Sequence, residues 1–388
     1  MVQKLFPIFL SWGIIMSESK KICSDKLCNE ETEVTPAKND DENTDTVKLE
    51  LKGKNYEISS LEDNLKGFED DIISKMFVQH YKTGFKAFDE NLGGGISPGL
   101  TVIGGEPGLG KSTFAMQIAE NIAASGVPVL YFTCEMPAKW IAAKAISRYT
   151  FVASKKAKSK ASRTEEFLDE ESYNKLKDDK KKLVKKAIDK VSENIRNNFY
   201  IIERTAPEFS AKNISAITNE FIDKKHKPPV IFVDYLQILT SDGEGRFLSD
   251  KQAVDSSINE LTSLAHQREN PVAVVLISSV SRRGYNKESD ISALKESGGI
   301  EYSADVILGL QFSKIRAGKN GFSRYKELSA EPRKMDIVFI KQRYGMNGKN
   351  VPFNYYSGYH YFEETKNKKS PESEKNTDDD FGTPPDII

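Results

Sequence analysis

The stretch GGEPGLGKSTF, residues 104–114, constrains the fold of this chain more than any other feature of its sequence. It follows the apolar run LTVIGG and leads into KSTFAMQIAENIAA, where apolar residues recur at helical spacing. A glycine-rich turn between a strand and a helix lets backbone N–H groups converge on phosphate oxygens, and the helix N-terminus adds its own unpaired N–H groups. The stretch therefore predicts a phosphate-binding loop, with a tight structural turn as the alternative.

Two side chains of this loop are candidates for direct contacts with a bound nucleotide. Lys111 is expected to reach the β- and γ-phosphates, and the Ser112 hydroxyl is expected to bind magnesium. The other expected binding positions are Gly105, Glu106, Pro107, Gly108, Leu109, Gly110 and Thr113. The loop alone predicts a held nucleotide but not the purpose of its hydrolysis.

Two acidic residues at the ends of apolar strands are candidates for the rest of the site. VIFVD, residues 230–234, ends in Asp234, which is expected to order the magnesium ion and its water. VLYFTCE, residues 129–135, ends in Glu135. We expect this strand to lie next to the phosphate-loop strand, where the carboxylate can act as the general base that aligns water. Taken alone, Glu135 is equally consistent with an acid at the N-terminus of the following helix.

Residues 81–364 alternate apolar strands with helical patterns, as a parallel sheet with crossover helices requires. The strand candidates are LTVIGG, VPVLYFTCE, PPVIFVDYLQIL, PVAVVLISS, ADVILGLQF and MDIVFIKQR. Their nearly continuous apolar character is typical of strands that are covered on both faces. We therefore expect one α/β domain over this range.

The ends of the chain differ from this domain in composition. Residues 1–60 are expected to form a disordered acidic arm, in which 1–15 are an over-extended start. A signal peptide or anchor is the alternative for the apolar opening. Residues 61–80 carry apolar residues at helical spacing and predict a linker helix that docks on a neighbour or caps its own domain. Residues 365–388 are expected to form a disordered acidic tail.

Charge and cysteine content limit the partners and the compartment. The formal net charge is -1, so nucleic acid would be bound only through a local concentration of Lys and Arg. The lysine-rich stretch 155–190 is one such concentration, but its many acidic residues favour a solvated surface helix. Cys23, Cys28 and Cys134 fit neither a zinc site nor a disulfide framework, which favours a cytoplasmic protein without a membrane partner.

Five motifs, in this order and spacing, resemble the motor domain of the DnaB-type replicative helicases, a branch of the RecA-like ATPases. They are GGEPGLGKSTFAMQIAENIA, YFTCEMP, VIFVDYLQIL, LKESGGIEYSADVILGLQ and KQRYGMNGKNVPFNYY. The resemblance implies a RecA-like P-loop NTPase fold, with a mostly parallel sheet flanked by helices and a C-terminal antiparallel β-hairpin. It also implies a homohexameric ring that binds ATP and Mg²⁺ between subunits, single-stranded DNA in its channel, and primase or a helicase loader as a partner.

The resemblance assigns roles to the residues that match the family's motifs. The matches are Lys111 and Ser112 for the nucleotide-binding pair, Asp234 for the magnesium-organising acid and Glu135 for the catalytic glutamate. Lys341 and Arg343 match the pair that one subunit extends to the γ-phosphate of its neighbour, with an ordinary surface pair as the alternative. Because such an arginine stabilises charge on the phosphoryl oxygens, an isolated subunit is expected to be nearly inactive.

Family members contact DNA through loops that correspond here to SDGEGRFLSDKQ and VSRRGYNKESD. The basic residues expected to hold phosphates in these loops are Arg246, Lys251, Arg282, Arg283 and Lys287. Tyr285 offers a face for base stacking. Exposed loops are often basic without binding DNA, so loops that make no DNA contact are the alternative.

Two features depart from the family pattern. Ser279, in SSVSR, occupies the place of a glutamine that is thought to sense the γ-phosphate, and a hydroxyl does not reach as far. The coupling of hydrolysis to DNA is therefore open, although a water molecule or Ser278 can substitute. The family's helical N-terminal collar has no counterpart in this sequence.

These observations leave two hypotheses of different kinds. The leading one is an ATP-dependent replicative DNA helicase or translocase, supported by the five motifs. The second is a non-motor RecA-like or KaiC-like ATPase that uses ATP to control assembly in replication or repair, which Ser279 favours. A metabolic P-loop kinase would need a lid with arginines and an acceptor pocket, and neither is evident.

Overall fold

The structure is a computed structural model that describes residues 47–51, 54–58, 60–66, 68, 79–203, 210–234, 236, 250–267, 269–279, 289, 297–316 and 323–365. The chain divides into two units, Met1–Phe77 and Val78–Ile388, each of which is described by itself. Within the described ranges, no helix has the length and apolar character that crossing a bilayer requires. The predictions made for residues 1–46 and 366–388 lie outside the described residues.

The first unit contains a β-hairpin where the sequence predicted only a disordered arm. Strand β1 (Val47–Leu51) pairs antiparallel with β2 (Lys54–Ile58), and helix α2 (Leu61–Leu65) follows at the start of the predicted linker helix. Apolar residues alternate with polar ones in both strands, and the register places Leu49 opposite Tyr56. The prediction of disorder was wrong for this stretch, because the acidic composition of the arm concealed a period-two pattern.

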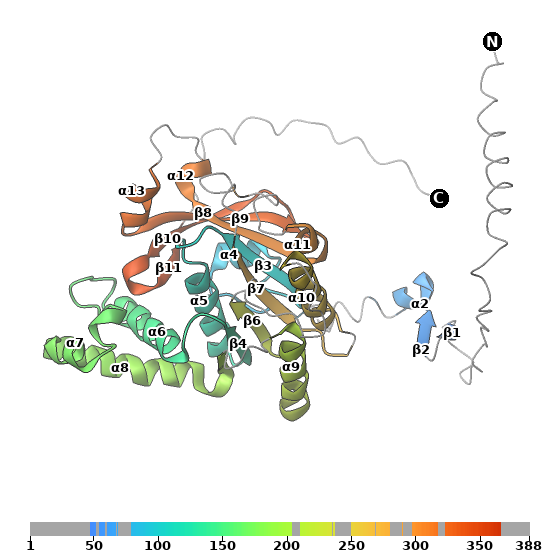
Figure 1. The fold of residues 1–388 in the computed structure, drawn as a ribbon, viewed down its shortest axis with the longest axis horizontal. Helices are drawn as coiled ribbons and strands as arrows, with labels where there is room; N and C mark the ends of the chain where they lie inside the picture. Colours follow the sequence, from blue (N-terminus) through green and yellow to red (C-terminus); the bar gives the residue numbers. More distant parts are fainter. Residues whose placement is uncertain are drawn as a thin grey trace, which may run out of the picture. The chain divides into compact units, whose positions relative to one another are not determined.

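In the described part of the second unit, nine strands form one sheet in the order β11-β10-β9-β8-β3-β7-β6-β4-β5 (Figure 1). The strands are β3 (Gly99–Gly105), β4 (Val129–Thr133), β5 (Phe199–Glu203), β6 (Val230–Asp234), β7 (Ala273–Ser279), β8 (Val306–Phe312), β9 (Arg333–Gln342), β10 (Asn350–Tyr356) and β11 (Tyr361–Glu364). Strands β3 to β8 pair in parallel, whereas β9, β10 and β11 are antiparallel to their neighbours. The predicted fold class is confirmed, including the C-terminal hairpin.

The sequence predicted six of these strands correctly, but it missed one edge strand and one adjacency. The edge strand β5 carries the apolar run FYII, but its side chains are only partly buried and it follows a long helical pattern, so it was not recognised as a strand. Strand β4 was expected next to β3, yet β7 and β6 lie between them. The order of strands along the chain does not determine their order in space, because strands that come later can enter the sheet between earlier ones.

Two layers of helices cover the faces of the sheet. Helices α4 (Lys86–Asn91) and α5 (Lys111–Ala124) pack on one face, where their core includes alternate side chains of each strand. Helices α9 (Ala211–Lys225), α10 (Asp250–Ala265) and α11 (Ser297–Ser303) pack on the other face (Figure 1). Because both faces are covered, the carboxyl ends of the strands are where side chains can meet a ligand.

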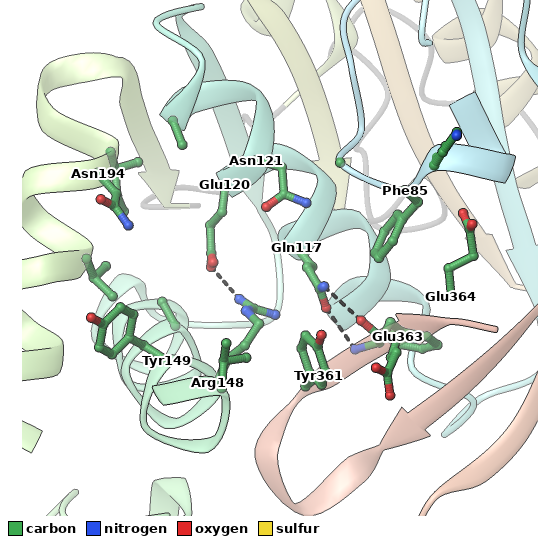
Figure 2. A pocket seen from close by; sticks show the side chains of 18 residues that line it. Phe85, Gln117, Glu120, Asn121, Arg148, Tyr149, Asn194, Tyr361, Glu363 and Glu364 are labelled. Carbon is green, nitrogen blue, oxygen red and sulfur yellow. Dashed lines mark hydrogen bonds and ion pairs between the residues drawn. The ribbon is translucent and has the colours of Figure 1, made fainter. Parts of the chain in front are cut away.

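Helices α6 (Ala138–Ala153) and α8 (Asp178–Ile195) form a further layer outside α5. A cavity of about 490 Å³ lies among α5, α6, α8 and β11 (Figure 2). In its wall, Arg148 of α6 forms an ion pair with Glu120 of α5 and donates a hydrogen bond to the carbonyl of His360. Burial raises the pKa of the Glu120 carboxyl, and the nearby Arg148 opposes this effect. These contacts tie α6 both to α5 and to the C-terminal hairpin.

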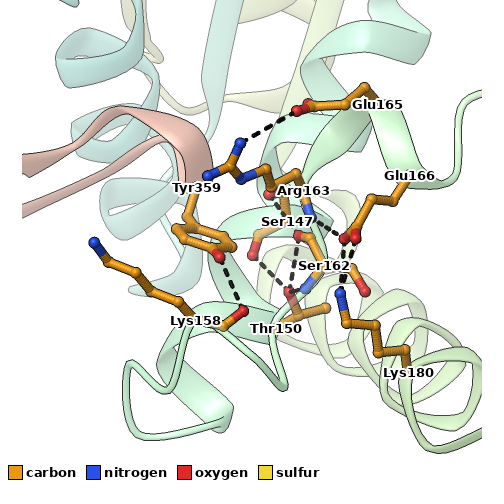
Figure 3. Close-up of polar contacts among 9 residues, drawn as sticks. All are labelled: Ser147, Thr150, Lys158, Ser162, Arg163, Glu165, Glu166, Lys180 and Tyr359. Atoms are coloured by element: carbon orange, nitrogen blue, oxygen red, sulfur yellow. Dashed lines mark hydrogen bonds and ion pairs between the residues drawn. The ribbon is translucent and has the colours of Figure 1, made fainter. Parts of the chain in front are cut away.

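The lysine-rich stretch 155–190 lies on the surface and is attached to the domain at its start. The Thr150 hydroxyl donates a hydrogen bond to the carbonyl of Ser162, and the Tyr359 hydroxyl donates one to the carbonyl of Lys158 (Figure 3). Further along, lysines of the stretch pair with its own carboxylates, Lys175 with Glu171 and Lys180 with Glu166. The solvated surface helix favoured by the sequence is therefore present as α7 (Glu170–Lys175) and α8.

Candidate nucleotide-binding site

The predicted phosphate loop leaves the end of β3 and enters α5. Gly110 precedes the helix with a φ of 98°, and a Cβ atom at this position would lie 2.7 Å from the ring of Tyr355. A left-handed backbone and the lack of space both require glycine here. The first turn of α5 lines the adjacent cleft, so its unpaired N–H groups are close to any anion bound there.

Lys111 turns back onto its own loop. Its Nζ atom donates to the carbonyl oxygens of Gly105, at 2.8 Å, and Glu106, at 3.1 Å. Burial lowers the pKa of the Lys111 ammonium to about 8, while the carboxylates of Asp234 and Glu135 act in the opposite direction. The lysine is thus a partly desolvated cation, whose attraction to a phosphate is stronger than it would be in water.

The Asp234 carboxylate is fixed by two hydroxyl groups at the end of β6. Ser112 Oγ donates to its Oδ1 atom at 3.0 Å, and the Tyr131 hydroxyl donates to Oδ2 at 3.1 Å. Burial raises the pKa of Asp234, although both hydrogen bonds lower it. The described residues contain no cluster of three or more His, Cys, Asp or Glu side chains, and Mg²⁺ commonly binds through one or two carboxylates together with substrate phosphates. The oxygen atoms of Ser112 and Asp234 fit such an ion.

Glu135 reaches the same cleft although its strand is not adjacent to β3. It follows β4 in a bend, where the Thr133 hydroxyl accepts a hydrogen bond from the backbone N–H of Met136 at 3.0 Å. The cleft has a volume of about 520 Å³. Its lining includes Lys111, Ser112, Thr113, Glu135, Asp234 and Ser279. The structure therefore brings the predicted lysine, hydroxyl and both acids together.

Three of the predicted loop positions do not line this cleft. The side chain of Leu109 is 1% exposed and belongs to the hydrophobic core beneath α5. Glu106 is also buried, and its carboxylate forms an ion pair with Arg324. Gly105 ends β3 and contributes its carbonyl group to Lys111. These residues shape the loop rather than facing the cleft.

Two arginines hold the outer side of the loop, one in the connection between β8 and β9 and one at the start of β9, and the sequence did not predict them. This connection contains helices α12 (Ser313–Arg316) and α13 (Arg324–Ser329). Besides its ion pair with Glu106, Arg324 donates to the carbonyl of Pro107 at 3.1 Å. Arg333 donates to the carbonyl of Gly108 at 3.0 Å and lies over the ring of Tyr355. Both arginines lie more than 200 residues after the loop, so no local sequence pattern links them to it.

The sequence also missed several side chains of the cleft, among them two basic residues. Lys144 of α6 and His360 both line it. Burial lowers the pKa of each, that of His360 to about 3, and each is also affected by the cation of Arg148. Lys144 is a single lysine in the otherwise small and apolar run IAAKAI, which is the one sequence signal that could have singled it out. It adds a second ammonium group to a cleft suited to phosphates.

Lys341 and Arg343 do not contribute to the lining of this cleft, and both are anchored within their own chain. The Nζ atom of Lys341 donates to the carbonyl of Glu301 at 2.6 Å. Arg343 pairs with Asp305 at 2.9 Å, and 43% of its side chain is exposed. Lys341 lies in β9 and Arg343 directly follows this strand, so the structure does not bring the two predicted cations to the cleft of their own chain.

The remaining predicted residues cannot all be placed. Ser279 ends β7 and lines the cleft, at the position expected for the nucleotide sensor. The candidate DNA-contacting residues Arg246, Arg282, Arg283 and Lys287, together with Tyr285, lie outside the described residues. Lys251 falls in α10, but its side chain is not among those described. The predictions for DNA binding therefore stay predictions.

Comparison with known proteins agrees with this architecture. The curated relatives include the protein called "Replicative DNA helicase DnaB" of Haemophilus influenzae, which is 28% identical over 288 residues, covering 72% of this chain and 55% of the relative. The protein of the same name from Pasteurella multocida is 27% identical over 271 residues, covering 69% and 52%. The chain thus spans about half the length of the curated relatives it matches.

Solved structures share the fold. A chain of the structure "The Structure Of A DnaB-Like Replicative Helicase And Its Interactions With Primase" superposes with a TM-score of 0.62 at 20% identity, covering 80% of this chain and 68% of that one. A second solved structure, described as an ATPase domain, gives a TM-score of 0.64 at 20% identity, covering 80% and 100%. The family described as "DnaB-like helicase C terminal domain" matches residues 81–364, the range that holds the whole nucleotide cleft. The chain belongs to this family.

Proposed function

We propose that this chain is the motor of a DnaB-type replicative DNA helicase. It hydrolyses ATP, with Mg²⁺, at the interfaces between subunits of a homohexameric ring, moves along single-stranded DNA and separates the duplex. Family membership and the fold support this proposal, and so do the names of the relatives, which are replicative DNA helicases. One structural neighbour is described together with its interactions with primase, which makes primase or a helicase loader the partner to test first. We place its work in the cytoplasm.

The observation that carries the proposal is that, among the described residues, the predicted cations Lys341 and Arg343 lie outside the cleft of their own chain. The cleft contains the phosphate loop, Asp234 and Glu135, but Arg343 does not line it and instead pairs with Asp305 beside β9. An arginine that stabilises the charge of phosphoryl transfer can be supplied by a second molecule, and is then worth about 10³ to 10⁵ in rate. A ring in which each subunit lends its arginine to the next completes every site.

The side chains of the cleft divide the work of hydrolysis. Lys111 leaves its two carbonyl partners and holds the β- and γ-phosphates, and Ser112 and Asp234 would hold a magnesium ion. A magnesium ion bound with the nucleotide would supply charge neutralisation at the phosphate oxygens. Glu135 accepts a proton from the attacking water. Lys341 and Arg343 of the neighbouring subunit meet the γ-phosphate.

The DNA contacts belong to the two loops that the sequence marked. Arg246 in the first loop and Lys251 at the start of α10, with Arg282, Arg283 and Lys287 in the second loop, neutralise backbone phosphates. Both loops follow strands whose ends lie at the nucleotide cleft, β6 and β7. Movement of the cleft residues on hydrolysis is therefore passed to the DNA over a short stretch of chain.

The test measures ATP hydrolysis at increasing concentrations of single-stranded DNA, together with strand separation of a forked duplex. A motor should hydrolyse ATP several-fold faster with DNA and should separate the fork. Arg343→Ala should abolish hydrolysis while nucleotide affinity is kept, and mixing it with Lys111→Ala subunits should restore activity. A hydrolysis rate that does not respond to DNA, together with no recovery in the mixture, would sink the proposal.

A second candidate, a non-motor ATPase that controls assembly, is favoured by Ser279. Its side chain lines the cleft, where a short hydroxyl replaces the longer amide expected in a motor. In that case hydrolysis would respond to assembly rather than to DNA. The same titration separates the two, because a switch should assemble with ATP yet leave the forked duplex intact.

A further inference from the structure

One carboxylate outside the nucleotide cleft joins three elements that are far apart in the sequence. Asp305 directly precedes β8 and is 9% exposed. Its Oδ2 atom accepts a hydrogen bond from the backbone N–H of Leu100 at 2.8 Å and lies 2.9 Å from Nε2 of His266. Its Oδ1 atom lies 2.9 Å from a guanidinium nitrogen of Arg343. The start of β3, the residue after α10 and the residue after β9 therefore meet at this side chain.

The backbone of Asp305 binds two of the same partners. Its N–H donates to the carbonyl of Leu100 at 2.9 Å, and its carbonyl accepts from the backbone N–H of Arg343 at 2.8 Å. Gly99 allows the carboxylate to approach the start of β3, because a Cβ atom at Gly99, whose φ is 129°, would lie 2.7 Å from Oδ2. These contacts hold the Asp305 carboxylate in one position, and they thereby also fix the guanidinium group of Arg343 that pairs with it.

The pairing leaves Arg343 able to act on a second partner. A guanidinium group carries five N–H donors in a rigid fork, and the ion pair with Asp305 engages one of its nitrogens. With 43% of the side chain exposed, the rest of the fork is accessible to an anion on another molecule. An anchored guanidinium also loses less conformational freedom when it binds, which favours pre-organised contacts.

The anchor connects Arg343 to the phosphate loop of its own subunit. Leu100 lies at the start of β3, and Gly105 at its end opens the phosphate loop. The strand lies between β8 and β7 in the sheet and spans about 20 Å, so it behaves as one rigid element. His266 adds α10, the helix that follows the first candidate DNA loop.

We propose that Asp305 is a positioning residue, which holds Arg343 in the place from which it meets the γ-phosphate bound by the neighbouring subunit. This inference rests on the function proposed above, because it takes Arg343 to act across a subunit interface. Asp305 itself does not line the nucleotide cleft. Its removal should slow turnover without weakening the binding of nucleotide to the same subunit's cleft.

The first experiment compares Asp305→Asn with Asp336→Asn in the full-length chain. Asp336 is a matched control, because it is another buried carboxylate of the β8–β9 region, but it pairs with the Ser313 hydroxyl away from Arg343. Asp305→Asn keeps a hydrogen-bond acceptor but removes the negative charge that fixes the guanidinium group of Arg343. We expect Asp305→Asn to lower kcat at least tenfold with KM unchanged within about twofold, and Asp336→Asn to behave as the wild type.

The second experiment assigns Asp305 to one half of the shared site by mixing variants. Asp305→Asn subunits keep an intact phosphate loop, so Lys111→Ala subunits, which keep an intact arginine, should restore activity. In a random equal mixture about a quarter of the ring interfaces combine the two intact halves. Mixing Asp305→Asn with Arg343→Ala should restore nothing, because every arginine is then misplaced or missing.

The outcomes separate the inference from the function on which it rests. Failure of Arg343→Ala and Lys111→Ala to complement each other would remove the shared site itself. If that pair does complement, three results contradict the role of Asp305. Activity of Asp305→Asn could be restored by Arg343→Ala subunits, or by neither Arg343→Ala nor Lys111→Ala subunits. Asp305→Asn could also hydrolyse ATP faster than the wild type. If Asp305→Asn does not bind a fluorescent ATP analogue, the mixing experiment is repeated with Asp305→Glu, which keeps the charge. The Asp305→Glu variant must then be restored by Lys111→Ala subunits and not by Arg343→Ala subunits.

Discussion

At the scale of single residues, burial is what gives the cleft its chemistry. Lys111, Lys144 and His360 all have pKa values lowered by desolvation, while that of Asp234 is raised. Each shift disfavours the charged form of the side chain. A bound triphosphate with magnesium favours the charged form of the two lysines again, because it places negative charge beside them. Part of the binding free energy is therefore linked to proton uptake.

This linkage predicts how nucleotide affinity depends on pH. The pKa of Lys111 is about 8, and a bound phosphate must raise it. Affinity should be nearly constant below pH 7, where Lys111 is already charged, and should fall by up to about tenfold per pH unit above pH 8, where binding requires proton uptake. Titration with a non-hydrolysable fluorescent ATP analogue from pH 6.5 to 9.5 measures the profile.

The control for this prediction is Lys111→Arg, whose guanidinium stays charged over the whole range. Its affinity should be weaker but independent of pH between 8 and 9.5. A wild-type profile as flat as that of the arginine variant would show that Lys111 does not carry the interaction.

The second prediction at this scale concerns Glu135. Glu135→Gln keeps the size and polarity of the side chain but cannot accept a proton, so ATP should bind with unchanged affinity while turnover falls by about 10² to 10⁴. Phosphate release and analogue binding are measured on the same preparation. Glu220→Gln, on the exposed face of α9, is the control and should hydrolyse ATP normally. Normal hydrolysis by Glu135→Gln would exclude it as the general base.

At the scale of elements, the unusual feature is the connection between β8 and β9. These strands are antiparallel neighbours, which a short turn can join, yet residues 313–332 separate them. Long connections in compact domains are commonly functional. Here the connection delivers Arg324 to Glu106 and Pro107, and Arg333 follows it onto Gly108. The phosphate loop is thereby held from outside as well as by β3 and α5.

The third prediction tests this support. Arg324→Met should leave the Glu106 carboxylate buried without its cation, and should lower the free energy of unfolding by about 2 kcal/mol, since Arg324 is partly exposed. Adding Glu106→Gln should recover more than half of the loss, because a neutral amide costs less to bury. Urea unfolding of the single and double variants measures both values.

The control for the loop support is Lys334→Met, which removes an exposed lysine hydrogen-bonded to Asn354 in the same region. Its free energy of unfolding should change by less than about 0.5 kcal/mol. Equal losses in the single Arg324→Met variant and the double variant would mean that the buried pair is not the source of the effect.

At the scale of the whole molecule, the proposed function takes the cleft of one subunit, with Lys341 and Arg343 of the next, as two halves of one site. The fourth prediction is that a non-hydrolysable ATP analogue with magnesium drives assembly, because the nucleotide binds both halves at once. Mass photometry should show hexamers with the analogue and smaller species without it. Lys111→Ala, which lacks the phosphate contact, should not respond. A monomer under both conditions would contradict the shared site.

Much of the site could be predicted because its parts are local in the chain. A phosphate loop needs consecutive residues of fixed type, so Lys111, Ser112 and the glycines were recognisable without any fold. Asp234 and Glu135 followed from strand ends, although the strand order assumed for Glu135 was wrong. The hairpin in the first unit was missed because its alternation is short and lies in a polar stretch, and β5 was missed because its apolar run FYII follows directly on a long helical pattern.

The kind of chemistry is readable from the amino-acid sequence, since backbone turns, helix starts and buried strands are encoded by neighbouring residues. Which distant side chains support that chemistry depends on the folded chain. Arg324 and Asp305 carry no local mark of their roles, because each acts through contact with residues remote in the chain. Lys144 stands out locally only as a lysine in an apolar run, and its place in the cleft comes from the packing of α6. Such contacts depend on how the whole chain packs, because burial and proximity, not residue type, make a lysine or a carboxylate part of a site.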